Sequence, residues 1–131
     1  MNTKLDKILA EISAGELLDK ITILEIKKEK IQNKDKLVEI EKELMSLNVT
    51  MKKFIPDNPK ISSFKDTLKN INLKLWDIED GKRYAEKNKD FGEKFIELAR
   101  NVYKFNDESA KIKLAINNTL GSNVKEVKSY E

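Results

Sequence analysis

The chain has 131 residues and contains neither cysteine nor histidine. This length fits one domain, large enough to build a hydrophobic core without disulfides or metals. The composition excludes disulfide bonds, zinc sites made of cysteine and histidine, thiol nucleophiles and an imidazole general base. Any chemistry must therefore come from carboxylates, lysine, arginine, tyrosine or the backbone.

The net charge of +3 is a small difference between 26 basic and 23 acidic side chains, which are interleaved along the chain. Interleaved charge is typical of a solvated helix surface, and we expect no nucleic-acid partner. No apolar run has the length of a signal peptide or a membrane span, so we expect a cytoplasmic protein and no membrane partner. The only arginines are Arg83 and Arg100. Either these positions require a planar guanidinium, or the two arginines occur by chance in a chain rich in lysine.

The first predicted helix covers residues 14–32, and Ser13 with Glu16 forms a capping box at its start. Its apolar residues lie around most of the circumference, which predicts a helix in the middle of the fold. Three charged residues lie between these apolar positions and cannot all face open water: Asp19, Lys20 and Glu25.

Three further helices are predicted at residues 36–54, 63–88 and 91–120. The second has a regular apolar seam and ends at a loop of residues 56–59, after which Ser62 or Ser63 caps the third. Asp90 with Glu93 signals the start of the fourth helix, and Gly121 signals its end. A second apolar stripe on the fourth helix predicts contact with two neighbours; it contains Ile96, Ala99, Tyr103, Ala110 and Leu114.

Short connections favour antiparallel neighbours, so residues 1–131 are predicted to form one all-α domain, an up-down four-helix arrangement. At the ends, residues 5–12 suit either a short helix or a strand. We favour a strand that pairs with residues 124–130 in a two-stranded ribbon closing the domain. The exposed edge of the second helix is a candidate surface for a homodimer.

The segment 75–83 is the most chemically concentrated part of the chain and holds its only tryptophan. Helical spacing places Trp76, Asp80 and Arg83 on one stripe. We expect this stripe to face Tyr103, Asn106 and Asp107 of the fourth helix across an aromatic-walled pocket for a small molecule. The alternative is a hydrogen-bonded polar layer that fixes the register of the helices.

A second candidate is a magnesium site built from carboxylate pairs at helical spacing: Glu16 with Asp19, Asp77 with Asp80, and Glu93 with Glu97. All-α nucleotide pyrophosphohydrolases hold Mg²⁺ with such carboxylates, and the metal activates water. Such pairs also arise by chance in a highly charged chain, and acidic residues near helix starts serve the helix dipole. Magnesium is therefore expected only if the protein is an enzyme of this kind, and no other cofactor is expected.

A third candidate is a cationic pocket for a dianionic small molecule, formed by Lys20, Arg83, Arg100 and Lys111. A cofactor-free helical isomerase of the chorismate-mutase kind works by such electrostatic positioning. The first helix, however, lacks the arginine found there in that family. Pairing of Arg100 with Glu97 or Asp107 is the simpler interpretation.

Three segments, residues 12–27, 75–80 and 90–107, together with Leu120–Gly121–Ser122 and Lys128–Ser129–Tyr130, resemble the family catalogued as domain of unknown function 6165. The resemblance spans nearly the whole chain. It implies a bacterial or phage protein associated with glycosyltransferases and surface-polysaccharide production, but it brings no activity and no catalytic residues. Our leading hypothesis is therefore an accessory or small-ligand-binding helical module with a small-molecule or protein partner. The competing class is an enzyme, either the magnesium-dependent hydrolase or the isomerase.

Overall fold

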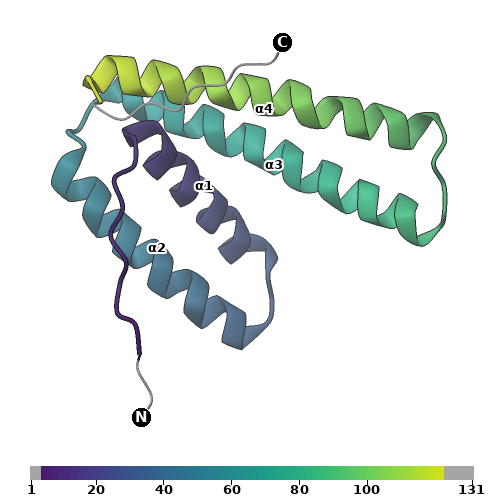
Figure 1. Ribbon diagram of the computed structural model, residues 1–131, viewed down its shortest axis with the longest axis horizontal. Helices are drawn as coiled ribbons and strands as arrows, with labels where there is room; N and C mark the ends of the chain where they lie inside the picture. The colour runs from purple at the N-terminus through teal and green to yellow at the C-terminus, as the bar shows by residue number, and fades with distance from the viewer. Residues whose placement is uncertain (1–3, 123–131) are drawn as a thin grey trace.

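The computed structural model describes residues 4–122, which form four α-helices and no strand (Figure 1). The helices are α1 (Ala14–Lys30), α2 (Lys34–Phe54), α3 (Pro59–Lys87) and α4 (Glu93–Leu120). The predicted all-α, four-helix arrangement is thus confirmed for this part of the chain. Each predicted helix is present, with ends that differ by up to four residues.

Helix α1 lies between the other three helices, as its apolar circumference predicted. It packs against α2 on one side and against the long α3–α4 hairpin on the other, whereas α2 packs against α1 alone. The hairpin extends well beyond α1 and α2 (Figure 1). The core is continuous and comprises Leu17, Leu18, Ile21, Leu24, Ile40, Leu44, Ile61, Leu68 and Ile116.

The helix boundaries follow local chemistry. Ser13 caps α1 by accepting a hydrogen bond from the Glu16 N–H, as predicted, and Gly121 ends α4 in the left-handed conformation at φ 65°. The prediction for α3 was wrong at its start: Asn58 caps the helix, and Pro59 occupies its first turn, where a missing N–H costs nothing. Gly92, rather than Asp90, is the N-cap of α4, and Asp90 instead accepts from the Gly92 N–H.

The predicted terminal ribbon is not supported. Residues 4–12 adopt neither a strand nor a helix, and their large apolar side chains Leu5, Ile8 and Leu9 are more than 80% exposed. The other half of the ribbon, residues 124–130, lies outside the described residues. No helix among residues 4–122 is long and apolar enough to cross a membrane.

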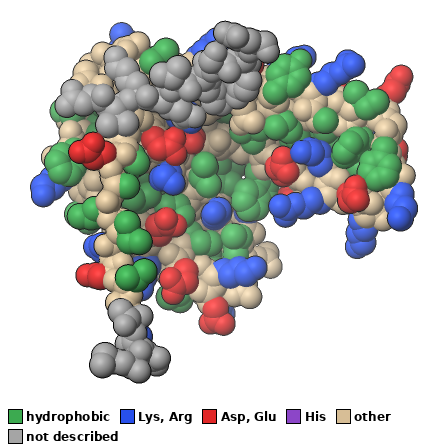
Figure 2. Space-filling model, in the orientation of Figure 1, with side chains coloured by type: hydrophobic (Ala, Val, Ile, Leu, Met, Phe, Trp, Pro, Cys, Tyr) green, Lys and Arg blue, Asp and Glu red, His purple; other side chains and the backbone are tan. Residues whose placement is uncertain are grey.

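Figure 2 shows apolar side chains on the surface among charged ones over both the compact end and the extended hairpin. On α2, Val38, Met45, Val49 and Phe54 are exposed, on the edge proposed for a homodimer. That dimer stays a prediction.

Candidate functional site

The first turn of α1 is fixed against the last turns of α4, and this contact orients the site. The Gly15 N–H donates to the buried Asn117 Oδ1 at 2.7 Å, and Glu16 forms an ion pair with Lys113 at 3.6 Å. A Cβ on Gly15 would lie 2.6 Å from the Lys113 carbonyl oxygen, so only glycine permits this approach of the two backbones. The fixed start of α1 determines which of its side chains face α3 and α4.

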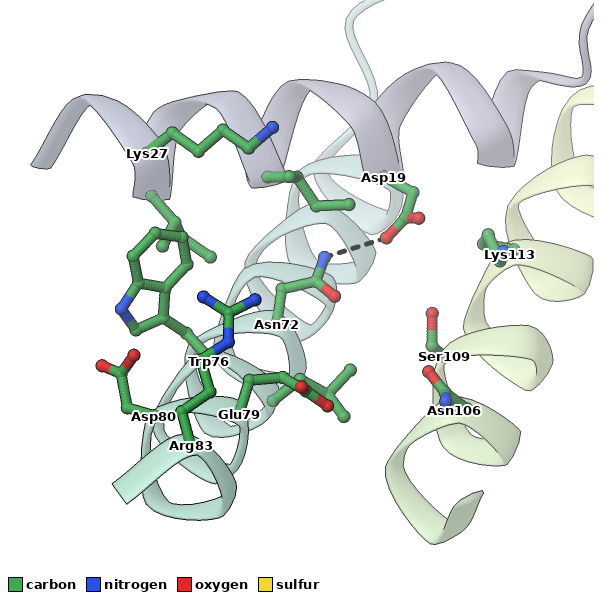
Figure 3. A pocket seen from close by; sticks show the side chains of 13 residues that line it. Asp19, Lys27, Asn72, Trp76, Glu79, Asp80, Arg83, Asn106, Ser109 and Lys113 are labelled. Atoms are coloured by element: carbon green, nitrogen blue, oxygen red, sulfur yellow. Dashed lines mark hydrogen bonds between the residues drawn. The ribbon is translucent and has the colours of Figure 1, made fainter. Parts of the chain in front are cut away.

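A cavity of about 430 Å³ opens where α1 meets the hairpin (Figure 3). This volume lies within the range of small-molecule sites. Its lining comes from three helices: Asp19, Ile23, Ile26 and Lys27 of α1; Asn72, Leu75, Trp76, Glu79, Asp80 and Arg83 of α3; and Asn106, Ser109 and Lys113 of α4.

The deep polar wall of the cavity is formed by Asp19 and Asn72. Asp19 is only 9% exposed, and its Oδ1 accepts a hydrogen bond from Asn72 Nδ2 at 2.9 Å. The same amide nitrogen lies 2.9 Å from the Thr22 hydroxyl oxygen, and Thr22 in turn donates to the Asp19 carbonyl at 2.8 Å. A buried carboxylate needs hydrogen-bond partners, and this network supplies them. It thereby fixes the Asp19 carboxylate at the junction of α1 and α3.

Farther along the same face of α3, the cavity is lined by Trp76, Asp80 and Arg83 (Figure 3). Lys27 of α1 faces the same region. Within residues 4–122, neither Lys27 nor Arg83 forms an ion pair or a hydrogen bond. Glu79, by contrast, is paired with Lys82 at 3.3 Å.

Ser109 lines the α4 side of the cavity. The residue as a whole is 6% exposed, but no buried side-chain oxygen or nitrogen among residues 4–122 lacks a hydrogen-bond partner, so its hydroxyl is not a buried unsatisfied group. Ser109 therefore adds a small polar group to the α4 wall of the cavity.

The carboxylate pairs considered for magnesium do not come together. Glu16 is paired with Lys113, Asp19 with Asn72, and Asp77 is exposed away from the cavity that Asp80 lines. Glu93 and Glu97 lie beside Arg100 around a separate surface depression of α4. Among residues 4–122 no group of three or more acidic side chains is arranged to hold a metal ion.

Comparison with known proteins assigns the chain to a family. A single family model matches residues 8–131, which include all four helices and every residue that lines the cavity. The chain belongs to DUF6165, a family of unknown function. No curated protein and no solved structure matches this DUF6165 chain.

Five residues singled out from the DUF6165 sequence line the cavity: Asp19, Trp76, Asp80, Arg83 and Asn106. The others lie elsewhere. Glu25 pairs with Lys65 of α3 at 3.5 Å, Lys20 is exposed, and Arg100 lies beside the surface depression of α4. Three more are exposed on α4, outside the cavity: Tyr103, Asp107 and Lys111. Of the three α4 residues expected to face Trp76, only Asn106 lines the cavity that Trp76 lines.

The polar lining residues that sequence reasoning missed are Lys27, Asn72, Glu79, Ser109 and Lys113. A signal for Asn72 was present, since it lies four residues before Trp76 on the same face of α3. Ser109 and Lys113 likewise follow Asn106 at steps of three and four. Lys27 carried no signal, because nothing in the sequence indicates which side of α1 meets α3.

Proposed function

We propose that this DUF6165 protein is a helical module that binds a small molecule in the cavity between α1, α3 and α4. The observation that carries the proposal is the cavity itself, about 430 Å³ of open space lined by the Trp76 indole, the Arg83 guanidinium and the Asp19 carboxylate. A volume of this size lies within the range of small-molecule sites. The hydrogen bond from Asn72 holds the Asp19 carboxylate at the cavity wall in a fixed position.

The composition of the walls supports the same proposal. The cavity combines an indole, three apolar side chains and a few convergent polar groups, the usual composition of ligand sites. Arg83 and Lys27 offer cationic donors that the described chain does not use. We further propose that the module is cytoplasmic and serves an accessory role in surface-polysaccharide production; this part rests on the association of the family alone.

The proposal predicts that the purified parent protein retains a bound molecule and that a variant with a filled cavity does not. Asn106 is exposed at the cavity wall, so Asn106→Trp fills the cavity from its rim without disturbing the core. Native mass spectrometry of the parent should show a bound mass that Asn106→Trp lacks. The matched control is Asp107→Trp, which adds the same indole one residue away and outside the cavity.

The control should retain the bound mass, and circular dichroism should show the same helix content in all three proteins. Equal retention by the parent and Asn106→Trp would place the bound molecule elsewhere. Absence of any bound mass, together with no change in Trp76 fluorescence in cell-extract metabolite fractions, would contradict the proposed function.

A further inference from the structure

The geometry points to the chemical class of the ligand: a small molecule with an anionic group at one end and hydroxyl or ammonium donors at the other, with an apolar face between them. This inference rests on the proposed binding function and adds to it. Three features of the cavity carry it, one for each part of the ligand.

The anionic end is indicated by Arg83 and Lys27. Both line the cavity and neither forms an ion pair or hydrogen bond within residues 4–122. A guanidinium has five N–H donors and no acceptor, so only acceptor atoms can satisfy it, and its planar fork matches a carboxylate or phosphate. Arg83 is also one of only two arginines in a chain rich in lysine.

Asp80, three residues before Arg83, is not the acceptor that pairs with the Arg83 guanidinium. Although it lines the same region, no ion pair forms between the two side chains. The third basic residue of the cavity, Lys113, is directed to Glu16 at 3.6 Å. Arg83 and Lys27 are therefore the cations that remain for a ligand.

The donor end is indicated by Asp19. Its carboxylate can only accept, and the contact it makes with a side chain is the 2.9 Å hydrogen bond from Asn72. Each carboxylate oxygen can accept more than one hydrogen bond, so the fixed carboxylate offers further acceptor sites at the cavity wall. A hydroxyl or ammonium group of a ligand supplies the matching donors.

Trp76 indicates the apolar middle part. Its indole lies on the same side of the cavity as Arg83 and offers a flat apolar surface, as Figure 3 shows. Cationic and acidic side chains balance in the lining, with Lys27, Arg83 and Lys113 against Asp19, Glu79 and Asp80. Such a site favours a ligand whose charged and donor groups are separated, over a polyanion.

Binding can be read directly from the fluorescence of Trp76, the only tryptophan. The probes are glucose 6-phosphate, which has hydroxyl donors, and glucosamine 6-phosphate, in which an ammonium replaces one hydroxyl. Neutral glucose and inorganic phosphate are the probes that lack one end. We expect saturable changes with the two sugar phosphates, and at least about ten-fold weaker binding of glucose and of phosphate, because each lacks one end. The stronger of the two sugar phosphates identifies the donor that Asp19 prefers.

Variants assign each end of the probe. Arg83→Gln should weaken binding of both sugar phosphates about ten-fold or more and leave the weak binding of glucose unchanged. Asp19→Asn should weaken glucosamine 6-phosphate more than glucose 6-phosphate. Arg100→Gln removes the other arginine, which lies outside the cavity, and should change neither affinity.

Equal binding of glucose and glucose 6-phosphate, or no binding of either sugar phosphate, would overturn this ligand class. The proposed binding function is tested separately by the retained mass and its loss in Asn106→Trp. If a mass is retained but no sugar phosphate binds, the binding function stands and the proposed ligand class is wrong. If no mass is retained and no sugar phosphate binds, both the function and the ligand class are wrong.

Discussion

The two halves of the α3–α4 hairpin differ in what covers them. In the half next to α1, α3 contributes Ile61, Leu68, Ile71 and Ile78 to the buried residues, and α4 contributes Ser109, Ile116 and Asn117. Between residues 79 and 108, no side chain is buried. The same two helices are thus part of a core at one end and form an exposed two-helix extension at the other.

This difference shows that helical periodicity predicts which face of a helix is apolar, but not how completely that face is buried. The apolar seam of α4 continues through Phe95, Leu98, Val102 and Phe105 in the extension, where each residue is only half-buried. Two helices can cover only one face of each other, so complete burial needs a third element. The cavity lies at the border, where α1 covers the base of the extension. Four of its lining residues are exposed there: Glu79, Asp80, Arg83 and Asn106.

The largest expected contrast is between Leu68→Ala and Leu98→Ala, the same truncation in the two halves. Leu68 is fully buried, so its truncation should lower the free energy of unfolding by about 3 kcal/mol or more. Leu98 is half-buried in the extension, and its truncation should cost about 1 kcal/mol. Equilibrium urea unfolding of both variants checks the contrast; equal losses would show that the extension is packed as tightly as the core.

Much of this architecture could be predicted from the sequence, because helices and their faces are local properties. The Ser13 capping box, the Gly121 stop and the apolar circumference of α1 gave the helix limits and the central position of α1 correctly. The start of α3 was missed because Pro59 was assigned to the loop, although proline is well suited to a first helical turn. The ribbon is not supported: the alternating apolar residues near Ile8 form no strand, and residues 124–130, expected to pair with them, lie outside the described residues.

The site could be predicted only in part. The stripe of Trp76, Asp80 and Arg83 follows from spacing within one helix, and it lines the cavity. The rotation of α4 does not follow from spacing: it is set by the close approach of Gly15 to the Lys113 backbone. With this rotation Asn106 lines the cavity, whereas Tyr103 and Asp107 lie outside it.

The next largest contrast compares alanine at two glycines: Gly15 of α1, which contacts the hairpin half next to α1 at Lys113, and Gly81 in the extension. In Gly15→Ala the added Cβ meets the Lys113 backbone at 2.6 to 3.0 Å, and backbone cannot move aside easily. The helices must separate, and the free energy of unfolding should fall by about 2 kcal/mol. In Gly81→Ala the nearest atom is Leu98 Cδ1 at 3.1 Å, in a side chain that the half-buried extension allows to shift.

Gly81→Ala should therefore gain up to about 1 kcal/mol from the higher helix propensity of alanine. The two variants are expected to shift the unfolding midpoint in opposite directions in one series of urea titrations. A loss in Gly81→Ala as large as that in Gly15→Ala would mean that Leu98 is held rigidly and that the two halves do not differ in this respect.

The smallest expected effect concerns ion pairs. Lys69 of α3 bridges to Glu29 of α1 at 2.7 Å, whereas Lys82 of the extension pairs with Glu79 within its own helix at 3.3 Å. The hydrogen bond to Glu29 raises the pKa of Lys69 above its ordinary value of 10.5, although partial burial opposes the shift. The folded protein thus holds this proton more tightly than the unfolded chain does.

The resulting stabilisation is complete below pH 10.5 and is lost as the pH rises through the raised pKa of the folded state. Both partners are partly exposed and screened by solvent, so Lys69→Gln should cost less than about 1 kcal/mol near neutral pH. This cost should shrink as the pH rises above about 10.5, measured as the difference in unfolding free energy from the parent. Lys82→Gln should cost only a few tenths of a kcal/mol, about the value of a pair within one helix. A larger loss for Lys82→Gln than for Lys69→Gln would contradict the view that α1 makes the difference between the two halves.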